Sequence, residues 1–202
     1  MDIIFATGNE HKMHEIRMIL SGVKINGEDV NIYSMKEKGI DIDIIEDGTT
    51  FLENAKIKAK AVWNVAKDSI VMADDSGLEV DYINKEPGIY SARYLGEDTS
   101  YRIKNANIIE RLKDAKDEER SARFVCAIAT CLPDGRILEA VETMEGRIAT
   151  EERGVNGFGY DPIFLVPPYV QTSSELSEEG KNEISHRGKA LRTTKKLLEE
   201  AF

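Results

Sequence analysis

The sequence is short of cysteine, and this scarcity excludes a disulfide-stabilised scaffold. Its two cysteines, Cys126 and Cys131, stand in one apolar segment. On a strand this spacing separates their Cα atoms by about 16 Å, whereas a disulfide needs Cα atoms within about 7 Å of each other. We therefore expect two buried thiols in a reducing compartment.

Long apolar runs are also missing. The longest uncharged apolar-rich run covers residues 124–133, whereas a membrane-spanning helix needs about 18 apolar residues. The chain also starts without a basic segment followed by an apolar one, which predicts that there is no signal peptide. We expect a cytoplasmic protein that has no membrane partner.

Basic residues are outnumbered by acidic ones. Lys and Arg total 27 against 37 Asp and Glu, which gives a net charge of −10. An extended grip on a nucleic acid requires a basic surface, so we expect no nucleic acid polymer as a partner. A small anionic ligand is compatible with this balance, because a few cations can act together inside one cleft.

Local patterns in the first part of the chain predict strands that alternate with helices. Residues 3–6 form a short apolar run that is expected to be a buried strand, and Asn9 can cap the helix that follows. Thr50 and Glu53 form a capping box, which predicts that a second helix starts there. We expect this helix to end near Lys67.

The middle of the chain is expected to contain a second buried strand and a third helix. The strand covers residues 70–73 and is closed by residues 74–77, Asp-Asp-Ser-Gly, which are typical of a turn. The helix covers residues 100–112. It is expected to turn three apolar side chains inward, Ile103, Ala106 and Ile109.

The last part of the chain predicts a hairpin and a closing helix. A long central strand is expected at residues 124–132, a Pro-Asp-Gly turn leads into a strand near residues 137–144, and residues 186–202 form an amphipathic helix. Early alternation and later pairing together predict an α/β protein with a mixed sheet flanked by helices.

The turn after the first strand is a candidate phosphate site. Thr7, Gly8 and Asn9 follow a strand and precede a helix that carries Lys12 in its first turn. Backbone N–H groups at a helix N-terminus attract anions, and glycine lets a phosphate approach closely. The segment is not a Walker loop, and an ordinary strand–turn–helix connection is an equally good interpretation of these residues alone.

Adjacent carboxylates follow the second strand. Asp74 and Asp75 can hold Mg²⁺, which prefers oxygen ligands, or one of them can act as a general base. The alternative is an Asp-rich turn whose side chains bond their own backbone. Glu46 and Asp47 can add another metal carboxylate, although a solvated acidic turn is the preferred interpretation of these two residues alone.

Two further segments combine glycine, aromatic and polar residues. Residues 154–162 contain three glycines and two aromatic side chains, which can stack a flat ring and bond its edge. Ser185 and His186 open the closing helix. A glycine-rich turn with packed aromatics, a helix cap and a structural imidazole are the alternatives to a binding role.

Taken together in this order, the motifs resemble one family. The chain is similar to the HAM1-like inosine/xanthosine triphosphatases, pyrophosphatases of non-standard purine nucleoside triphosphates. The resemblance covers nearly the whole chain and rests on six segments: residues 5–9, 50–55, 73–78, 87–94, 157–162 and 184–188.

The resemblance implies a fold and a reaction. The fold would be an elongated mixed sheet in a single domain, residues 1–202, of two intertwined lobes with a central substrate cleft, and the protein would be a homodimer. The reaction would be hydrolysis of dITP, ITP or XTP to the monophosphate and pyrophosphate with Mg²⁺ as cofactor.

The resemblance also implies roles for individual residues. Asp75 would be the proton acceptor and a metal ligand, supported by Asp74. Glu46 would be the other metal carboxylate, with Asp47 as the alternative because many relatives carry a longer acidic segment here. Catalytic cations would be Lys12 and Lys58. The remaining substrate contacts would be Thr7, Gly8, Asn9, Ser76, Phe158, Gly159, Tyr160, Asp161, Lys181, His186 and Arg187.

Base selection follows from hydrogen bonding. Hypoxanthine and xanthine carry an acceptor oxygen where adenine carries an amino donor, so donors from Lys181 or Arg187 would satisfy the first two bases only. Two other functions stay open at this point. One is a Maf-like pyrophosphatase that acts on other modified nucleotides, and the other is a nucleotide-binding sensor without catalysis.

Overall fold

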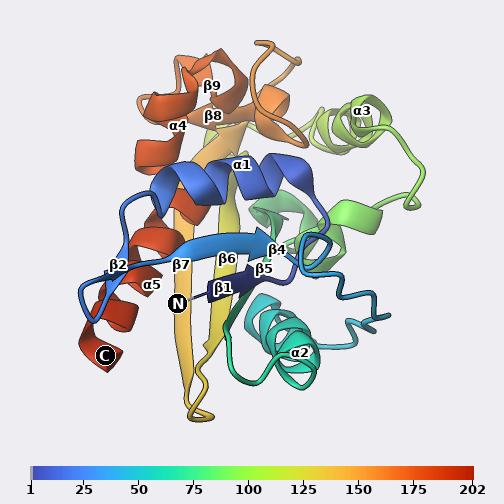
Figure 1. Cartoon of the computed structure of the whole chain (residues 1–202). Helices are drawn as coiled ribbons and strands as arrows, with labels where there is room; N and C mark the ends of the chain where they lie inside the picture. Colours follow the sequence, from blue (N-terminus) through green and yellow to red (C-terminus); the bar gives the residue numbers. More distant parts are fainter. Residues whose placement is uncertain (1) are drawn as a thin grey trace. The chain divides into compact units, whose positions relative to one another are not determined.

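The computed structural model describes residues 2–202, apart from the side chain of His11. Strands and helices follow one another along the chain as shown in Figure 1. In order they are β1 Asp2–Phe5, α1 Glu10–Ile19, β2 Lys24–Ile25, β3 Glu28–Asp29, β4 Asn31–Ser34, α2 Phe51–Trp63, β5 Ile70–Val80, α3 Tyr101–Arg111, β6 Ser121–Cys131, β7 Ile137–Ile148, β8 Phe164–Val166, β9 Gln171–Thr172, α4 Glu178–Ile184 and α5 His186–Ala201.

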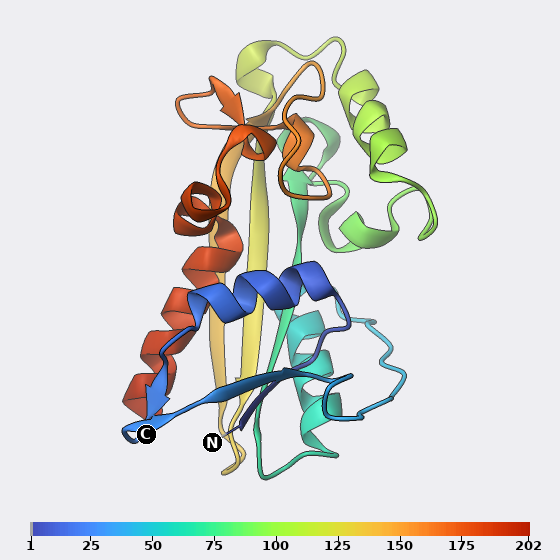
Figure 2. The same ribbon diagram turned by 45° about the horizontal axis from the view of Figure 1, so that its top comes forward.

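Seven strands form one mixed sheet in the order β4-β1-β5-β6-β7-β8-β9, and β2 pairs with β3 separately. Strand β1 lies between β4 and β5 and is parallel to both. Figure 2 shows the ribbon from a second direction. Strand β8 is antiparallel to β7 and to β9. The predicted mixed α/β class is therefore confirmed.

The chain divides into two compact units that interleave in the sequence. Unit 1 contains Met1–Asp75, Cys126–Glu142 and Arg187–Phe202, and unit 2 contains Ser76–Val125 and Thr143–His186. Each of the three longest strands, β5, β6 and β7, changes unit within the strand.

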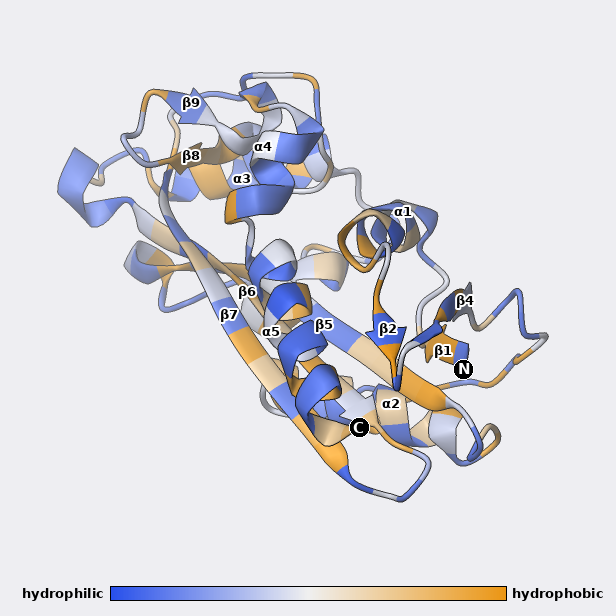
Figure 3. Cartoon of the chain, turned by 60° about the vertical axis from the view of Figure 1, so that its left-hand side comes forward, coloured by the Kyte–Doolittle hydropathy of each residue, from blue (hydrophilic) through white to orange (hydrophobic). Residues whose placement is uncertain are grey.

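Helices α1, α2 and α5 belong to unit 1, and local sequence signals explain how α1 and α2 begin. Asn9 caps α1 by accepting a hydrogen bond from the Lys12 amide at 3.2 Å, and the predicted capping box of Thr50 and Glu53 opens α2. Figure 3 shows α1 with a hydrophobic side and a hydrophilic side. The hydrophobic side joins the unit 1 core through Met13 and Ile16, as the helical spacing predicts.

Helix α2 ends at Trp63, four residues before the predicted end. Asn64 is its C-cap, and the chain then continues in tighter turns, in which the amide of Val65 bonds to the carbonyl of Val62 at 3.1 Å. Asparagine is a weak helix former, so the helix stops there although apolar spacing continues to Ala66.

The predicted turn at residues 74–77 is wrong, because β5 runs without interruption from Ile70 to Val80. Asp74 is buried and Asp75 is half-buried within this strand. A strand can carry adjacent buried carboxylates only where partners offset the cost of burying the charges. Here the partners are the cations of Lys12, Lys58 and Arg187.

Helix α3 of unit 2 turns only one of the three predicted side chains, Ile109, toward the core. Ile103 is 58% exposed, whereas Lys104, Asn105 and Ile108 are buried. The ammonium of Lys104 donates to the carbonyl of Ala92 at 2.6 Å. A polar side chain therefore lies on the buried face of α3, where the apolar pattern predicted only apolar residues. The prediction failed because the partner of Lys104 is a backbone carbonyl, which no pattern of side chains reveals.

Both cysteines are buried free thiols, as predicted. Within residues 2–202, no helix combines the length and the apolar character that crossing a bilayer requires.

Candidate active site

Two adjacent carboxylates on β5 are the centre of the candidate site in unit 1. Because successive side chains of a strand point to opposite faces, Asp74 and Asp75 meet different partners. Asp74 is 1% exposed, and Asp75 retains contact with solvent. The two carboxylates therefore differ in environment although they are neighbours in the chain.

Asp74 lies between two cations. Lys12 of α1 donates to its two carboxylate oxygens at 3.1 and 3.0 Å, and Nε of Arg187 on α5 lies 3.4 Å from Oδ2. Arg187 also bonds to Glu15 of α1. Burial disfavours the ionised form of Asp74, but the charges of Lys12, Arg187 and Lys58 outweigh it and hold the pKa of Asp74 well below its usual range.

Asp75 has the opposite pKa shift. Burial raises the pKa of this carboxyl, and the Lys58 ammonium and the Asn54 amide lower it only in part. The negative charges of Glu46 and Asp74 raise it further. Neighbouring carboxyls whose pKa values are pushed apart can divide the work, one staying ionised and the other exchanging a proton. Asp75 is the group suited to proton exchange.

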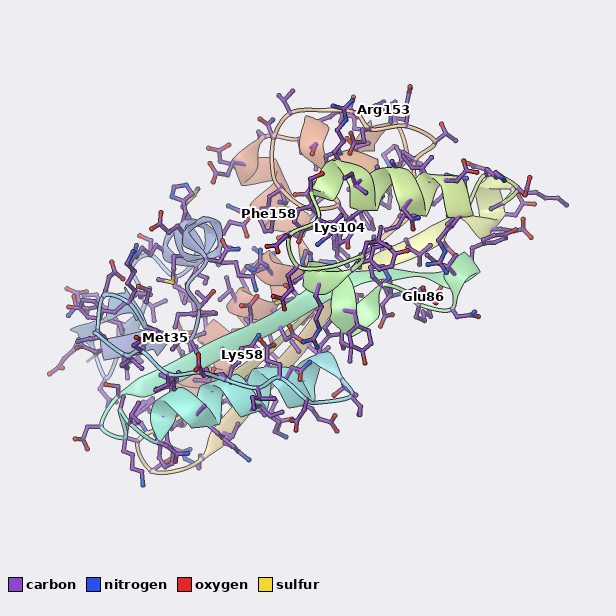
Figure 4. The ribbon with its side chains drawn as sticks, turned by 90° about the vertical axis from the view of Figure 1, so that its right-hand side faces the viewer. Met35, Lys58, Glu86, Lys104, Arg153 and Phe158 are labelled. Atoms are coloured by element: carbon purple, nitrogen blue, oxygen red, sulfur yellow. The ribbon has the colours of Figure 1, made fainter. Side chains whose placement is uncertain are left out.

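Lys58 connects Asp75 to Glu46. Its ammonium lies 2.8 Å from Oε2 of Glu46 and 3.6 Å from Oδ1 of Asp75. Burial opposes the charged form of Lys58, but the carboxylates of Asp75, Asp74 and Glu46 outweigh it and raise its pKa. Figure 4 shows Lys58 on the side of α2 that is turned toward β5. A cation therefore already sits between two carboxylates that come from different segments.

This arrangement fits a divalent cation. Mg²⁺ takes oxygen ligands and usually binds one or two carboxylates together with water and substrate phosphates. Glu46 and Asp75 are such a pair, and the shared ammonium of Lys58 shows that a cation is stable beside them. Asp47, the alternative, is exposed. Among the described side chains, no group of three or more His, Cys, Asp or Glu forms a dedicated metal cage.

The turn that precedes α1 is open to solvent. Oγ1 of Thr7 accepts a hydrogen bond from the Asn9 amide at 3.2 Å, which shapes the turn. A Cβ atom at Gly8 would meet nothing within 4 Å, so the protein leaves room beside this residue. The positive dipole end of α1 therefore lies beside a space that an anionic group can enter.

Asp161 organises the glycine-rich loop of unit 2. Its Oδ2 accepts hydrogen bonds from the Phe158 amide at 2.8 Å and from Nζ of Lys181 at 2.7 Å. The same ammonium lies 5.0 Å from the centre of the Phe158 ring. Gly157 has φ +76°, and a Cβ there would be 2.3 Å from Oδ2 of Asp161, so only glycine fits this turn.

Aromatic contacts fix the rest of this loop. The hydroxyl of Tyr160 donates to the carbonyl of Ser91 at 2.7 Å, and its ring packs edge-to-face on Tyr101 at 5.2 Å. His186 stacks on Phe124 with ring centres 4.9 Å apart. Figure 4 labels Phe158, whose side chain is only half-buried. Phe158 is thus less buried than Tyr160 of the same loop.

The structure brings most of the sequence-predicted residues into two groups. Within unit 1 it joins Lys12, Lys58, Asp74, Asp75 and Glu46, with Thr7, Gly8 and Asn9 at the start of α1. Within unit 2 it joins Phe158, Gly159, Tyr160, Asp161 and Lys181. Ser76 is the first residue of unit 2, on β5, and His186 lies at the start of α5.

Arg187 has two partners that the resemblance did not name. Its guanidinium binds Asp74 and Glu15 in unit 1. Its predicted contact with the edge of the base stays a prediction. The buried carboxylate of Asp74 supplies the partner that a buried guanidinium requires.

Sequence reasoning missed two residues of unit 1. Asn54 donates to Oδ2 of Asp75 at 3.2 Å, and Glu15 pairs with Arg187. Asn54 lies on the buried face of α2 next to Ala55, so a polar residue inside an apolar stripe was the available signal. For Glu15, the sequence contains no signal that identifies a distant partner.

The site combines a pair of carboxylates whose pKa values are shifted in opposite directions with nearby lysines and a helix N-terminus. Together with the mixed α/β sheet, it is typical of an enzyme that binds an anionic substrate beside acid–base groups. Residues 3–197 match the model of the Ham1 family. The chain belongs to the Ham1 family.

Relatives and solved structures agree over the full length. A dITP/XTP pyrophosphatase of Clostridium perfringens is 46% identical over 200 residues, which cover 96% of each chain. One of Bacillus licheniformis is 45% identical and covers 99% of both. The Ham1 protein of Staphylococcus aureus superposes with a TM-score of 0.87 at 39% identity over 100% of both chains, and that of Coxiella burnetii with 0.87 at 38% identity over 99% of both.

Proposed function

We propose that this chain hydrolyses dITP, ITP and XTP to the nucleoside monophosphate and pyrophosphate, and so keeps deaminated purines out of nucleic acids. The observation that carries the proposal is the carboxylate pair on β5, with Asp74 held by Lys12 and Arg187 and Asp75 next to Lys58. The names of the relatives, dITP/XTP pyrophosphatase, support the same substrates.

The triphosphate is the proposed ligand of unit 1. It brings about four negative charges, so carboxylates can face it only through a cation. Glu46 and Asp75 are the residues that would hold Mg²⁺, which lowers the pKa of a bound water and offsets charge on the leaving pyrophosphate. The amides around Gly8 and the ammonium groups of Lys12 and Lys58 would bind the phosphate oxygens.

Asp75 is the proposed proton acceptor. Water attacks a phosphorus of the α–β linkage, the bridging P–O bond breaks, and the water proton passes to a carboxylate oxygen of Asp75. Lys12 and Lys58 stabilise the negative charge that develops on the phosphate oxygens. Asp74, whose pKa is low, stays ionised and keeps Lys12 and Arg187 in place.

The purine base is the proposed ligand of unit 2. The half-buried ring of Phe158 offers a stacking face, and Lys181 offers donors to the 6-oxo group of hypoxanthine or xanthine. Adenine has an amino donor at this position and would face a second donor. Lys181 is the donor that we assign to base selection, because its ammonium lies beside the Phe158 ring.

A nucleotide panel tests the proposal. With Mg²⁺, we expect kcat/KM for ITP and XTP to exceed that for ATP by about 10⁴-fold, because a missed buried hydrogen bond discriminates by roughly this factor. Steady-state pyrophosphate release from ITP, XTP, ATP and GTP is the measurement, and a chelator is the control for the metal. Equal rates on all four nucleotides would contradict it.

The same panel separates the alternatives. Faster turnover of methylated or pyrimidine nucleotides would favour a Maf-like pyrophosphatase. Calorimetric binding of ITP without pyrophosphate release would favour a sensor that lacks catalysis. We also propose that the enzyme is cytoplasmic and that it is a homodimer, as the resemblance of its motifs implies. Sedimentation velocity tests the second point.

Replacing Lys181 by methionine tests base selection. We expect kcat/KM for ITP to fall about 100-fold while that for ATP changes by less than about threefold, because only the 6-oxo base loses a donor. The control is Asp161→Asn/Lys181→Met, which also removes the partner charge of Asp161. A parallel fall for both nucleotides, with unchanged melting temperature, would contradict the role of Lys181.

A further inference from the structure

Asn54 is a polar residue on the buried side of α2. It is 1% exposed and neighbours the apolar residues Phe51 and Ala55 on the same face. A buried amide costs stability unless both its ends are bonded. The partners of Asn54 therefore indicate why this position is not apolar.

Both ends of the amide are bonded, and the two partners come from different segments. Nδ2 donates to Oδ2 of Asp75 at 3.2 Å, and Oδ1 accepts from the amide of Gly48 at 2.9 Å. One partner can only accept and the other can only donate, so the orientation of the amide is determined. Asn54 thus connects the proposed proton acceptor on β5 to the segment that carries Glu46.

Close packing holds the Gly48 end of this connection. A Cβ atom at Gly48 would lie 2.6 Å from Oδ1 of Asn54 and 2.8 Å from Cβ of Glu53, so only glycine allows the approach. Glu53 fixes the next residues independently, because its Oε2 accepts from the amide of Thr49 at 2.7 Å. Glu46 lies two residues before Gly48, in the segment that the hydrogen bond between Asn54 and Gly48 holds.

We infer that Asn54 is a positioning residue, which fixes the carboxylate of Asp75 relative to the Glu46–Gly48 segment and thereby sets the affinity of the site for a divalent cation. The inference rests on the proposed function, which assigns the cation to Glu46 and Asp75. Groups that hydrogen-bond to metal-binding carboxylates typically change metal affinity by about 10- to 100-fold when they are removed.

The test compares Asn54→Leu with Glu53→Ala. The first removes both hydrogen bonds and keeps the volume. The second is the matched control, since the carboxylate of Glu53 bonds to Thr49 and Thr50 at the same helix start. Mn²⁺ binding, measured by electron paramagnetic resonance with a non-hydrolysable α,β-imido analogue of ITP, reports the metal site independently of turnover.

We expect Asn54→Leu to raise the dissociation constant of Mn²⁺ and the Mg²⁺ concentration for half-maximal activity at least tenfold, and Glu53→Ala to change neither by more than about twofold. Equal effects of the two substitutions, or unchanged Mn²⁺ binding in Asn54→Leu, would overturn the inference. If Asn54→Leu does not fold, the same criteria apply to Asn54→Ser. Absence of ITP hydrolysis by the unmodified protein would instead refute the proposed function.

Discussion

Replacing Asp75 by asparagine is expected to lower kcat for ITP hydrolysis about 10³-fold, within the range typical of a lost general base. Asparagine keeps the shape of the side chain and an oxygen that can accept from Asn54, but it cannot take a proton from water. The measurement is the initial rate of pyrophosphate release at saturating ITP and Mg²⁺.

The stability of this variant provides the internal control. Because the pKa of Asp75 is raised in the folded protein, the ionised carboxyl opposes folding at neutral pH, and a neutral isostere removes that cost. We therefore expect the melting temperature of Asp75→Asn to be equal to that of the unmodified protein or higher. Asp134→Asn, in an exposed turn, is the matched control with full activity. Unchanged activity, or loss that accompanies unfolding, would contradict the role of Asp75.

Local signals in the sequence predicted local structure well. The Asn9 cap and the box of Thr50 and Glu53 depend on residues within one helical turn, so the sequence alone was sufficient to find them. The mixed sheet also followed from the order of apolar runs. These features do not depend on tertiary contacts with residues that are distant in the sequence.

Structure that depends on distant partners was not predictable in the same way. Residues 74–77 look like a turn because Asp, Ser and Gly are turn formers, yet β5 continues through them. The cations that make this strand stable, Lys12 and Arg187, come from the two ends of the chain. The prediction of the buried face of α3 also failed. The acceptor of the buried Lys104 is a backbone carbonyl, and no pattern of side chains reveals it.

In the candidate site too, individual residues were predictable from the sequence, whereas their contacts with distant partners were not. The motifs identified Asp75, Lys58 and Glu46, because the resemblance carries residue identities. Their partners were not identified, since the pairing of Asn54 with Asp75 and of Arg187 with Asp74 depends on tertiary packing. Which of two adjacent carboxyls has the raised pKa is decided by burial and by neighbouring charges, and these are properties of the fold.

The second large effect is expected from Arg187→Met. Arg187 is 4% exposed and pairs with the buried Asp74 and with Glu15. Removing one partner of a buried ion pair leaves an uncompensated charge and costs about 3–5 kcal/mol. We expect the free energy of unfolding, measured with urea at pH 7, to fall by this amount. The matched control is Arg17→Met on the same helix as Glu15, because the pair of Arg17 and Glu37 is exposed and contributes at most about 1 kcal/mol.

The pH dependence of this loss identifies its cause. A lowered pKa means that the ionised Asp74 stabilises the fold at pH values above its usual pKa, and that this stabilisation is lost as the pH falls through the folded-state value. In Arg187→Met the folded-state pKa of Asp74 rises, so the variant loses that stabilisation at a higher pH than the unmodified protein. Adding Asp74→Asn to Arg187→Met removes the unpaired charge and is expected to recover part of the loss at pH 7. A loss below 1 kcal/mol, or no recovery in the double variant, would show that the buried charge of Asp74 does not require Arg187.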